Sequence, residues 1–385
     1  MKKLFYLGLI GLMLFEAANV YFIMPMPGGS QEIDSIDIAY ALHTWRWVWR
    51  AGFALMIVIG YASSSFAKKW IPPVLLIVLA GTVYAANFSM AADTMFYQPE
   101  TLSMKDTVEN LVDPDRLVLG VEYEGQAKAY PIQYLGYHHQ IRDSIGGKPI
   151  MVTYCTVCRT GRIFEPVVQG RIDEFRLVGM DRFNAMFEDK STGSWWRQAT
   201  GEAVAGPSKG SRLPEFPSAQ TTLATWIALY PNTLIMQPDH RFQAEYDSMR
   251  TYEAGRLTGR LTRRDTASWQ AKSWIIGVDA DGTSKAYDWN LLMKERMLYD
   301  VLQGKPIAVI LSEDSASFVV LERITADQTF TLVHDTIKSG ENAYDFMGRA
   351  LNGNGHDLKR IRAHQEYWHS WQAFHPLAQP YQLPQ

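Results

Sequence analysis

Cysteine is nearly absent from this chain, which has only two, Cys155 and Cys158, among 385 residues. Two thiols cannot build a disulfide-stapled scaffold, nor a zinc or iron–sulfur site that needs four cysteines of one chain. An excess of charge of either sign is also absent, because 37 Lys and Arg stand against 40 Asp and Glu. Without a basic surplus to neutralise a phosphate backbone, nucleic acid is not an expected partner.

Long apolar runs, by contrast, fill much of the first 92 residues. Three of them cover 4–24, 48–66 and 71–90, and each is close to the ~20 residues that cross a bilayer as a helix. We therefore predict a transmembrane region over 1–92 with three helices, of which the last two form a helical hairpin. The alternative for the first run is a cleaved signal peptide, which has the same basic start and apolar stretch.

The lysines that flank these runs predict an orientation. Lys2, Lys3, Lys68 and Lys69 all lie on one side if the three runs span the membrane, and the positive-inside rule makes that side cytoplasmic. The chain after about residue 90 then faces the periplasm or the cell exterior, on a multi-pass protein of the cytoplasmic (inner) membrane. The lipid bilayer is thus an expected partner.

Polar residues in or beside the runs need a separate explanation. Glu16 lies inside the first run, where an ionisable group is protonated, turned toward a partner helix, or functional. Arg46 and Arg50 alternate with three tryptophans, as in an interfacial belt where arginine extends toward water. Because one helix already anchors a protein, three helices also indicate a lateral partner such as a membrane protein complex.

The chain after residue 117 repeats itself. Residues 120–130 return as residues 277–287, and Gly147-Lys148-Pro149-Ile150 returns as Gly304-Lys305-Pro306-Ile307. Both pairs of segments lie 157 residues apart, and a shared offset is not expected by chance. We therefore predict two copies of one unit of about 140 residues.

Each copy alternates short strands with short helices, which predicts an α+β fold of mainly antiparallel sheets. We expect strands at 117–121, 127–130, 149–154, 162–168 and 175–178, and helices at 131–141 and 223–230. The predicted organisation is a linker over 93–116, a first repeat with the Cys-x-x-Cys motif over 117–245, a linker over 246–273 and a second, degenerate repeat over 274–385. The two copies of this internally duplicated fold are expected to pack about a pseudo-twofold axis, behind the N-terminal transmembrane helices.

The two cysteines form a Cys-x-x-Cys motif in the first copy. The 157-residue offset places Ser312 opposite Cys155 and Ser315 opposite Cys158, so only one copy has the thiols. A pair that merely filled a turn would have little reason to differ in this way between the copies. We therefore interpret the pair as a functional site.

Three interpretations of the pair remain open. The first is a redox dithiol in which Cys155 and Cys158 are catalytic, although the second cysteine of a thioredoxin-type motif lies in a helix and Arg159 here begins what looks like a turn into a strand. The second is a site for one soft or borderline metal ion, Cu, Zn or Fe, with His138 and His139 as further ligands because the second copy has neither histidine. The third is a buried thiol pair or a structural disulfide in an oxidising compartment.

At these residues the chain resembles the domain-of-unknown-function family 3179 (DUF3179). The positions that carry the resemblance lie between about residues 117 and 236. They are Ala129-Tyr130-Pro131, His138, Asp143, Gly146-Gly147, Tyr154-Cys155, Cys158, Trp196, Gln198, Thr200-Gly201-Glu202-Ala203 and Gly206-Pro207. The resemblance implies an extracytoplasmic domain of unassigned activity.

Four positions depart from the pattern of that family. Tyr137 replaces a tryptophan, His139 a glutamate and Thr156 a proline, and Arg159 stands where a glycine usually follows the second cysteine. Because such a glycine commonly serves a positive φ, we expect a constrained backbone at Arg159.

These observations predict a membrane-anchored extracytoplasmic protein whose Cys-x-x-Cys/His site binds a metal or carries out thiol or electron redox chemistry. The competing prediction is a non-catalytic subunit or assembly factor of a membrane protein complex, which the three helices would dock.

Overall fold

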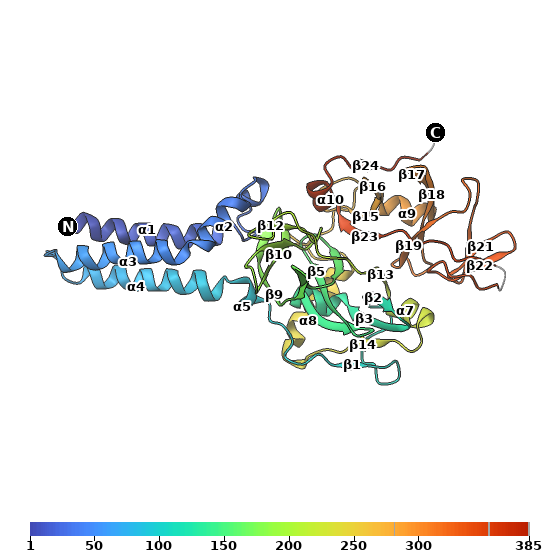
Figure 1. The fold of residues 1–385 in the computed structure, drawn as a ribbon, viewed down its shortest axis with the longest axis horizontal. Coiled ribbons are helices and arrows are strands. Elements are labelled where there is room, and N and C mark those ends of the chain that lie inside the picture. The colour runs from blue at the N-terminus through green and yellow to red at the C-terminus, as the bar shows by residue number, and fades with distance from the viewer. Residues whose placement is uncertain (281, 353–354, 384–385) are drawn as a thin grey trace. The chain divides into compact units, whose positions relative to one another are not determined.

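The computed structural model describes residues 1–280, 282–352 and 355–383 (Figure 1). The chain divides into two compact units. Unit 1 comprises Met1–Tyr97, Val168–Arg197 and Glu202–Arg212, and unit 2 comprises Gln98–Val167, Gln198–Gly201 and Leu213–Gln385. Most of residues 168–212, which were predicted within the first repeat, thus belong to the same unit as the N-terminal helices.

Unit 1 begins with helices. They are α1 (Lys2–Tyr21), the 3-10 helix η1 (Gly29–Glu32), α2 (Ile36–Thr44), α3 (Arg46–Ala62), α4 (Ile71–Tyr84), the π-helix η2 (Ala85–Ser89) and α5 (Ala92–Met95). Within the described residues, two helical stretches are long and apolar enough to cross a membrane, Lys2–Tyr21 and Ile71–Ser89. The third predicted span, α3, has 17 residues, which is short of the ~20 residues of a typical span.

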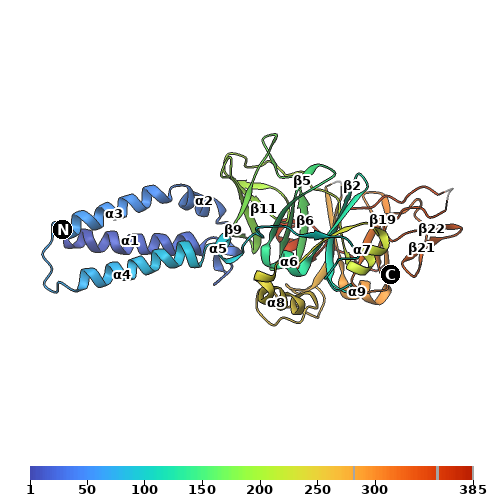
Figure 2. The same cartoon turned by 90° about the horizontal axis from the view of Figure 1, so that it is seen from below.

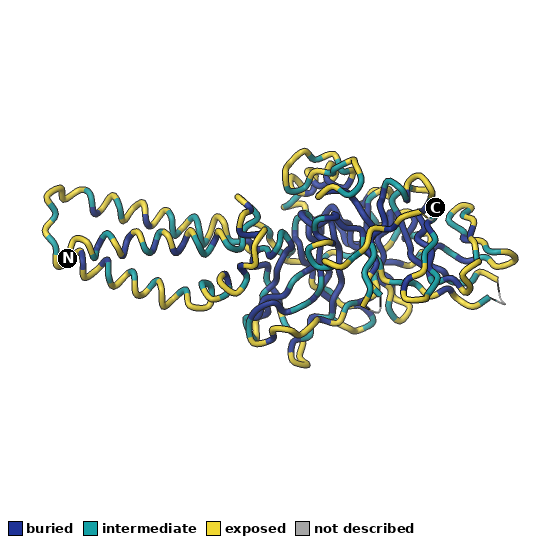
Figure 3. Tube along the Cα trace, turned by 90° about the horizontal axis from the view of Figure 1, so that it is seen from above, coloured by how far each residue is buried: buried dark blue, intermediate teal, exposed yellow. Residues whose placement is uncertain are grey.

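The helices α3 and α4 both pack against α1 (Figure 2). Their interface is apolar and consists of Phe5, Leu9, Leu12, Phe15, Ile57 and Leu79. Close approach depends on Gly60, because a Cβ atom there would lie 2.3 Å from the backbone nitrogen of Phe5. Small residues at such crossings are typical of helices that associate in lipid. Many residues on the outer faces of the helices are exposed (Figure 3).

A polar cluster joins the three helices. Arg50 on α3 donates from Nε and Nη2 to the two carboxylate oxygens of Glu16 on α1, at 2.7 and 2.9 Å. Asn87 on η2 accepts from Arg50 at 2.6 Å and donates to Glu16 at 2.9 Å. The interpretation of Arg50 as an interfacial residue turned toward water is therefore wrong, because its guanidinium lies against a fully buried carboxylate. Glu16 finds its partners inside the chain.

Unit 1 also contains an antiparallel sheet of order β12-β11-β10-β9. Its strands are β9 (Phe175–Asp181), β10 (Asn184–Asp189), β11 (Trp195–Arg197) and β12 (Ala203–Ala205), and a two-stranded ribbon of β7 (Val167–Val168) and β8 (Arg171–Ile172) precedes them. The sheet packs on α2, where Ala39 lies among Met186 and Trp195. Nε2 of His43 on α2 lies 3.0 Å from the carboxylate of Glu188 on β10. The helix α2 and this sheet therefore share one core.

The first half of unit 2 contains a five-stranded sheet of order β1-β14-β3-β2-β13 and a three-stranded sheet β4-β5-β6. The strands are β1 (Met104–Lys105), β2 (Leu117–Tyr123), β3 (Gln126–Pro131), β4 (Gln140–Ile145), β5 (Lys148–Cys155), β6 (Thr160–Phe164), β13 (Ser218–Thr222) and β14 (Leu234–Met236). The helices are α6 (Ile132–His138), α7 (Leu223–Leu229), η3 (His240–Phe242) and α8 (Gln243–Glu253). The predicted helix over 131–141 ends early because His139 adopts a positive φ of 59° and β4 begins after it.

The second half contains sheets of order β23-β15-β16-β24, β17-β18-β19 and β20-β21-β22. The strands are β15 (Trp274–Ala280), β16 (Thr283–Asp288), β17 (Met297–Leu302), β18 (Lys305–Leu311), β19 (Phe318–Glu322), β20 (Thr331–Val333), β21 (Thr336–Ser339), β22 (Asn342–Tyr344), β23 (Ala363–Tyr367) and β24 (Gln379–Pro380), with helices α9 (Trp289–Glu295) and α10 (Trp368–Phe374). Among the described strand pairs, only β14 with β3 and β16 with β24 are parallel. The protein is thus a mixed α and β structure with many small antiparallel sheets.

Nine elements of the first half and nine of the second follow one another in the same order. β2, β3, α6, β4, β5 and β6, followed by β13, α7 and β14, correspond to β15, β16, α9, β17, β18 and β19, followed by β23, α10 and β24. Single contacts recur as well. The hydroxyl of Tyr130 donates to Asp143 at 2.7 Å, and 157 residues later that of Tyr287 donates to Asp300 at 2.8 Å.

Contacts between the two halves are reciprocal. β23 of the second half lies against β6 of the first, and β13 of the first half lies against β19 of the second. Nε2 of Gln220 on β13 donates to Oε1 of Gln365 on β23 at 2.8 Å. These glutamines occupy equivalent places, since Gln220 pairs with Leu119 on β2 and Gln365 pairs with Ile276 on β15.

Candidate thiol site

The two cysteines lie in the hairpin between β5 and β6. Cys155 is the last residue of β5 and pairs with Thr160, the first residue of β6, so that residues 156–159 form the turn. The prediction of a turn into a strand at this motif is confirmed. Neither cysteine starts a helix, so the helix dipole that activates a thioredoxin-type thiol does not act here.

Both thiols are fully buried and are not joined in a disulfide. Burial raises the pKa of Cys158 well above its usual range, and the adjacent Cys155 and the charge of Glu366 raise it further. A hydrogen bond from Ser370 acts in the opposite direction. The thiol of Cys158 is therefore protonated at neutral pH, and a thiolate at this place needs nearby positive charge.

A buried lysine and histidine lie over the motif. Nζ of Lys272 donates to the backbone oxygen of Val157, the residue before Cys158, at 2.7 Å, and lies 3.0 Å from Nε2 of His369. Burial lowers the pKa of Lys272 to about 8, although both cysteines raise it. Burial, followed by the charge of Lys272, lowers the pKa of His369 to about 3. His369 is therefore a neutral imidazole.

An ion pair completes the surroundings of the thiols. Thr153 and Arg162 face each other across β5 and β6, which places them on the same side of the hairpin as Cys155. Nη2 of Arg162 lies 3.4 Å from Oε2 of Glu366, and the hydroxyl of Ser370 donates to Oε1 of that carboxylate at 2.5 Å. Burial raises the pKa of Glu366, while the charge of Arg162 lowers it. The thiols thus border a buried polar cluster.

Arg159, which follows the second cysteine, has a φ of +57°. This agrees with the backbone constraint expected at this position. The side chain makes contacts that hold it there: Nη2 donates to the backbone oxygen of Glu253 at 2.9 Å, Nε donates to Gln365 at 3.0 Å, and the guanidinium lies 3.7 Å from the ring centre of Trp274. Residues of α8 and β15 therefore fix the position of its guanidinium group.

The predicted histidine ligands point to other partners. Nε2 of His138 lies 2.7 Å from the hydroxyl of Tyr246, and Nδ1 of His139 lies 2.9 Å from the backbone oxygen of Tyr154. Burial lowers the pKa of His139 to about 4. Across residues 1–280, 282–352 and 355–383, no three His, Cys, Asp or Glu side chains form a group that could hold a metal ion. A metal site made by Cys155, Cys158, His138 and His139 is therefore not supported.

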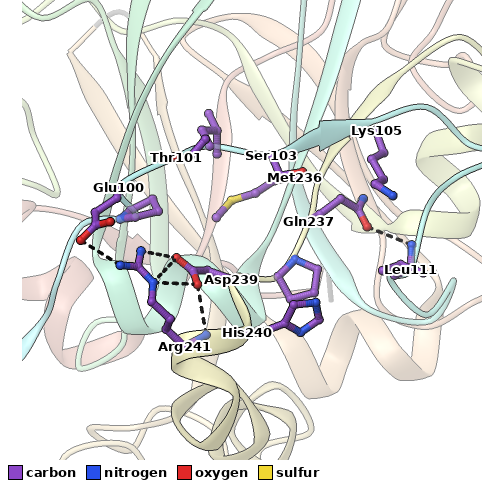
Figure 4. A pocket seen from close by; sticks show the side chains of 13 residues that line it. Glu100, Thr101, Ser103, Lys105, Leu111, Met236, Gln237, Asp239, His240 and Arg241 are labelled. Atoms are coloured by element: carbon purple, nitrogen blue, oxygen red, sulfur yellow. Dashed lines mark hydrogen bonds and ion pairs between the residues drawn. The ribbon is translucent and has the colours of Figure 1, made fainter.

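Another cavity, of about 560 Å³, lies beside β1 and β14 (Figure 4). Its most prominent charges compensate one another, because Arg241 pairs with Glu100 at 2.9 Å and with Asp239 at 2.6 Å. Gln237 on its wall accepts from the backbone nitrogen of Leu111. The wall contains neither cysteine, so this cavity is separate from the thiol site.

The family model for proteins of unknown function, DUF3179, matches residues 96–378. The chain belongs to this family. No curated protein and no solved structure matches the chain. The DUF3179 match covers every residue of the thiol site and does not assign a reaction to it.

Some positions that carried the sequence resemblance to DUF3179 now have a structural explanation. Nε2 of Gln198 donates to the hydroxyl of Thr153 and to the backbone oxygen of Thr160, both at 3.1 Å. This amide therefore ties β5 to β6 beside the thiols. Asp143 has a different task, because it accepts from Tyr130 in the five-stranded sheet.

The sequence prediction missed Lys272, His369, Glu366 and Ser370. Each lies more than a hundred positions from the cysteines in the chain and reaches them only through packing of the second half on the first. A signal for two of them existed in the repeat, because Lys272 lies 157 residues after Asp115 and His369 lies 145 residues after Ala224. Comparing the linkers and helices, as well as the motif, would have indicated them.

Proposed function

We propose that Cys155 and Cys158 form a redox-active thiol pair in an extracytoplasmic domain. The observation that carries this proposal is that the polar groups around the thiols occur at only one of two equivalent places in unit 2. The argument first requires that the two halves correspond residue by residue.

We infer that unit 2 is an internal duplication with a pseudo-twofold relation between its halves. The backbone nitrogen of Leu223 donates to the oxygen of Arg116 at 2.8 Å, and that of Trp368 donates to the oxygen of Ser273 at 3.0 Å. One residue further on, the nitrogen of Ala224 donates to Pro114 and that of His369 to Ala271. Together with the reciprocal contacts of β6, β13, β19 and β23, these bonds support equivalence at the residue level.

With that equivalence, the difference between the two hairpins is clear. The second hairpin has Ser312 and Ser315 in place of the cysteines. The residues that surround the cysteines change with them: Lys272 corresponds to Asp115, His369 to Ala224, Glu366 to Thr221 and Arg162 to Val319. These four groups are thus confined to the first hairpin, whereas at the second hairpin the hydroxyl of Ser312 donates to Asp335 and Arg296 donates to the hydroxyl of Ser315.

Stability alone does not account for this cluster. Buried charges cost free energy, and a buried ion pair is often no more stable than apolar residues of the same size. The second hairpin occupies an equivalent place with the smaller Val319 and Ala224. Because the fold manages there with a different set of polar contacts, the presence of Lys272, Arg162 and Glu366 beside the thiols favours a chemical role.

The chemistry that suits the site is thiol–disulfide exchange. One thiol of the pair loses its proton and attacks a disulfide R–S–S–R, which releases one R–S⁻ and leaves a mixed disulfide. The second thiol then attacks the mixed disulfide, so that a Cys155–Cys158 bond forms and the second R–S⁻ leaves. Both leaving groups take up the protons of the pair, and the sum is one dithiol oxidised and one disulfide reduced to two thiols.

We further propose that all three long helices span the membrane and that unit 2 lies outside the cytoplasm. The bonds that join Glu16, Arg50 and Asn87 across α1, α3 and η2 support a three-helix bundle. Lys68 and Lys69 in the loop before α4 favour the cytoplasmic side for that loop. Protection of unit 2 from added protease in right-side-out vesicles would contradict this orientation.

Redox titration of the full chain in mild detergent tests the function. The protein is equilibrated with glutathione buffers of graded potential, and its thiols are counted by mass after maleimide trapping. We expect both thiols to disappear and return together, and this behaviour to be lost in Cys155→Ser and in Cys158→Ser. The matched control, Ser312→Ala with Ser315→Ala in the second hairpin, should titrate like the parent protein.

Two results would overturn the proposal. One is a pair that stays reduced at every potential in the folded protein. The other is stoichiometric metal in the parent protein, found by elemental analysis, that is absent from the Cys155→Ser/Cys158→Ser variant.

A further inference from the structure

Lys272 is a buried cation without a carboxylate partner. Its side chain is 8% exposed, and among the described residues no Asp or Glu forms an ion pair with it. Its Nζ instead bonds to the oxygen of Val157 and contacts His369, and it lies 4.6 Å from the ring centre of Tyr367. All of these partners are neutral. A buried ammonium group of this kind is costly unless an anion forms beside it.

The groups that supply such an anion are the thiols. The bond to Val157 fixes Nζ of Lys272 over the turn that holds Cys155 and Cys158, and a thiolate at either cysteine raises the pKa of Lys272. We propose that Lys272 is the residue that stabilises the thiolate of the Cys155/Cys158 pair, with His369 holding its ammonium group in place. This inference rests on the proposed redox function and names the group that makes its first step possible.

The role of His369 follows from its protonation. Nε2 of His369 lies 3.0 Å from Nζ of Lys272 and 3.2 Å from the backbone oxygen of Val157. In the neutral imidazole, Nε2 accepts from the ammonium group when the proton sits on Nδ1 and donates to Val157 when it carries the proton itself. The proposed role requires the tautomer with the proton on Nδ1. Two of the three ammonium protons then bond to the imidazole and to the Val157 oxygen. These two bonds fix the direction of the third proton. His369 acts through Lys272 and is therefore a positioning residue.

Other charged groups surround the pair and enter its pH dependence. Asp265 and Arg263 lie on the same segment as Lys272 and act on it with opposite sign. Glu366 on β23 opposes thiolate formation at Cys158, and Arg162 on β6 partly neutralises Glu366. Lys272 is the cation among them that contacts the turn itself.

The test follows the rate at which the pair reduces a small aromatic disulfide, as a function of pH. In the parent protein the rate should rise with pH as the thiolate forms. In Lys272→Met the profile should shift upward by roughly one pH unit, which corresponds to a rate about tenfold lower at a fixed pH below the inflection. Lys272→Arg keeps the charge and should recover most of the rate. Lys294→Met, at an exposed lysine on α9, is the control and should match the parent protein.

The outcomes separate this inference from the proposed function. A parent protein that reduces the disulfide, with an unchanged profile in Lys272→Met, would overturn the role of Lys272 and leave the redox function standing. A parent protein that does not react at any pH would overturn the redox function itself. If Lys272→Met does not fold, His369→Ala provides the second variant: the inference requires a profile shifted in the same direction by a smaller amount, and an unshifted profile contradicts it.

Discussion

The hairpin that carries Cys155 and Cys158 and the hairpin that carries Ser312 and Ser315 each join two antiparallel strands, and each is followed by a strand that touches the other half of unit 2. What they share is the backbone, its pairing and the aromatic and aspartate contacts beneath it. What they do not share is the polar cluster above the turn. The difference separates the part of unit 2 that the fold requires from the part that a reaction would require.

The second hairpin has a polar network of its own, which makes the contrast more specific. Asp314 accepts from the hydroxyls of Thr222, Thr225 and Ser317 at 2.9, 3.0 and 2.5 Å. Beside it, Arg296 donates to the hydroxyl of Ser315 at 3.0 Å, and the hydroxyl of Ser312 donates to Asp335 at 2.8 Å. The Asp314 network itself consists of one carboxylate with hydroxyl donors. It satisfies its own groups, whereas the first hairpin leaves Nη1 of Arg162 buried without a hydrogen-bond partner in the described structure.

The largest expected effect comes from exchanging the ion pair of the first hairpin for the residues of the second. Glu366→Thr removes the carboxylate from a buried arginine and should destabilise the protein by about 3–5 kcal/mol. Adding Arg162→Val should restore most of that loss, because the unpaired charge is gone. Unfolding midpoints of the full chain in mild detergent measure both. Equal losses in the single and double variants would show that the pair is not the source of the effect.

A second pair of substitutions tests what the halves share. A Cβ atom on Gly120 would lie 2.4 Å from the ring of Trp226, and one on Gly277 would lie 2.3 Å from the ring of Trp371. Gly120→Ala and Gly277→Ala should therefore each cost about 1–3 kcal/mol through overpacking, and by similar amounts. Calorimetry of the two variants provides the comparison. A large effect in one half alone would contradict the equivalence of the two scaffolds.

The smallest expected effect is a pH dependence of stability that comes from Glu253 on α8, in the half of unit 2 that carries the thiols. Burial raises the pKa of Glu253 to about 7, although Arg116 and Arg159 lower it. A carboxyl group with a raised pKa binds its proton more tightly in the folded chain, so its contribution to stability is complete below about pH 4.5 and is lost as the pH rises through 7. Glu253→Gln should therefore match the parent protein at pH 4 and exceed it at pH 8 by on the order of 1 kcal/mol. Denaturation at the two pH values checks this, and a gain at pH 4 would contradict the assignment to Glu253.

Local features of the fold could be predicted from the sequence, because they depend on neighbours in the chain. The β2–β3 hairpin, the strand before Cys155 and the turn after it all follow from short patterns of glycine, proline and apolar residues, whereas the constraint at Arg159 was expected from the resemblance to DUF3179. The predicted helix over 131–141 was too long, since no proline or glycine marks the positive φ at His139.

The candidate site could be predicted only in part, because its chemistry comes from distant segments. The cysteines were visible as a motif, whereas Lys272 and Glu366 reach them by packing between halves that the sequence does not place. His138 and His139 are close to the motif in sequence, yet they bond to Tyr246 and Tyr154. Glu16 is a similar case. The sequence did not show its partner, because Arg50, which donates to its carboxylate, lies 34 positions away in the chain. That argument for a separate membrane partner is thereby removed.

The hydrogen bond between Gln220 and Gln365 joins the two halves of unit 2 and is asymmetric. Two identical amides that meet at equivalent places cannot both donate, so one must act as donor and the other as acceptor. Arg159 decides between them, because its Nε also donates to Oε1 of Gln365 and so fixes that oxygen as the shared acceptor. The corresponding residue of the other half is Ala316, which has no donor to offer. Arg159, next to the second cysteine, thus makes the contact between these two glutamines asymmetric, with Gln220 as the donor and Gln365 as the acceptor.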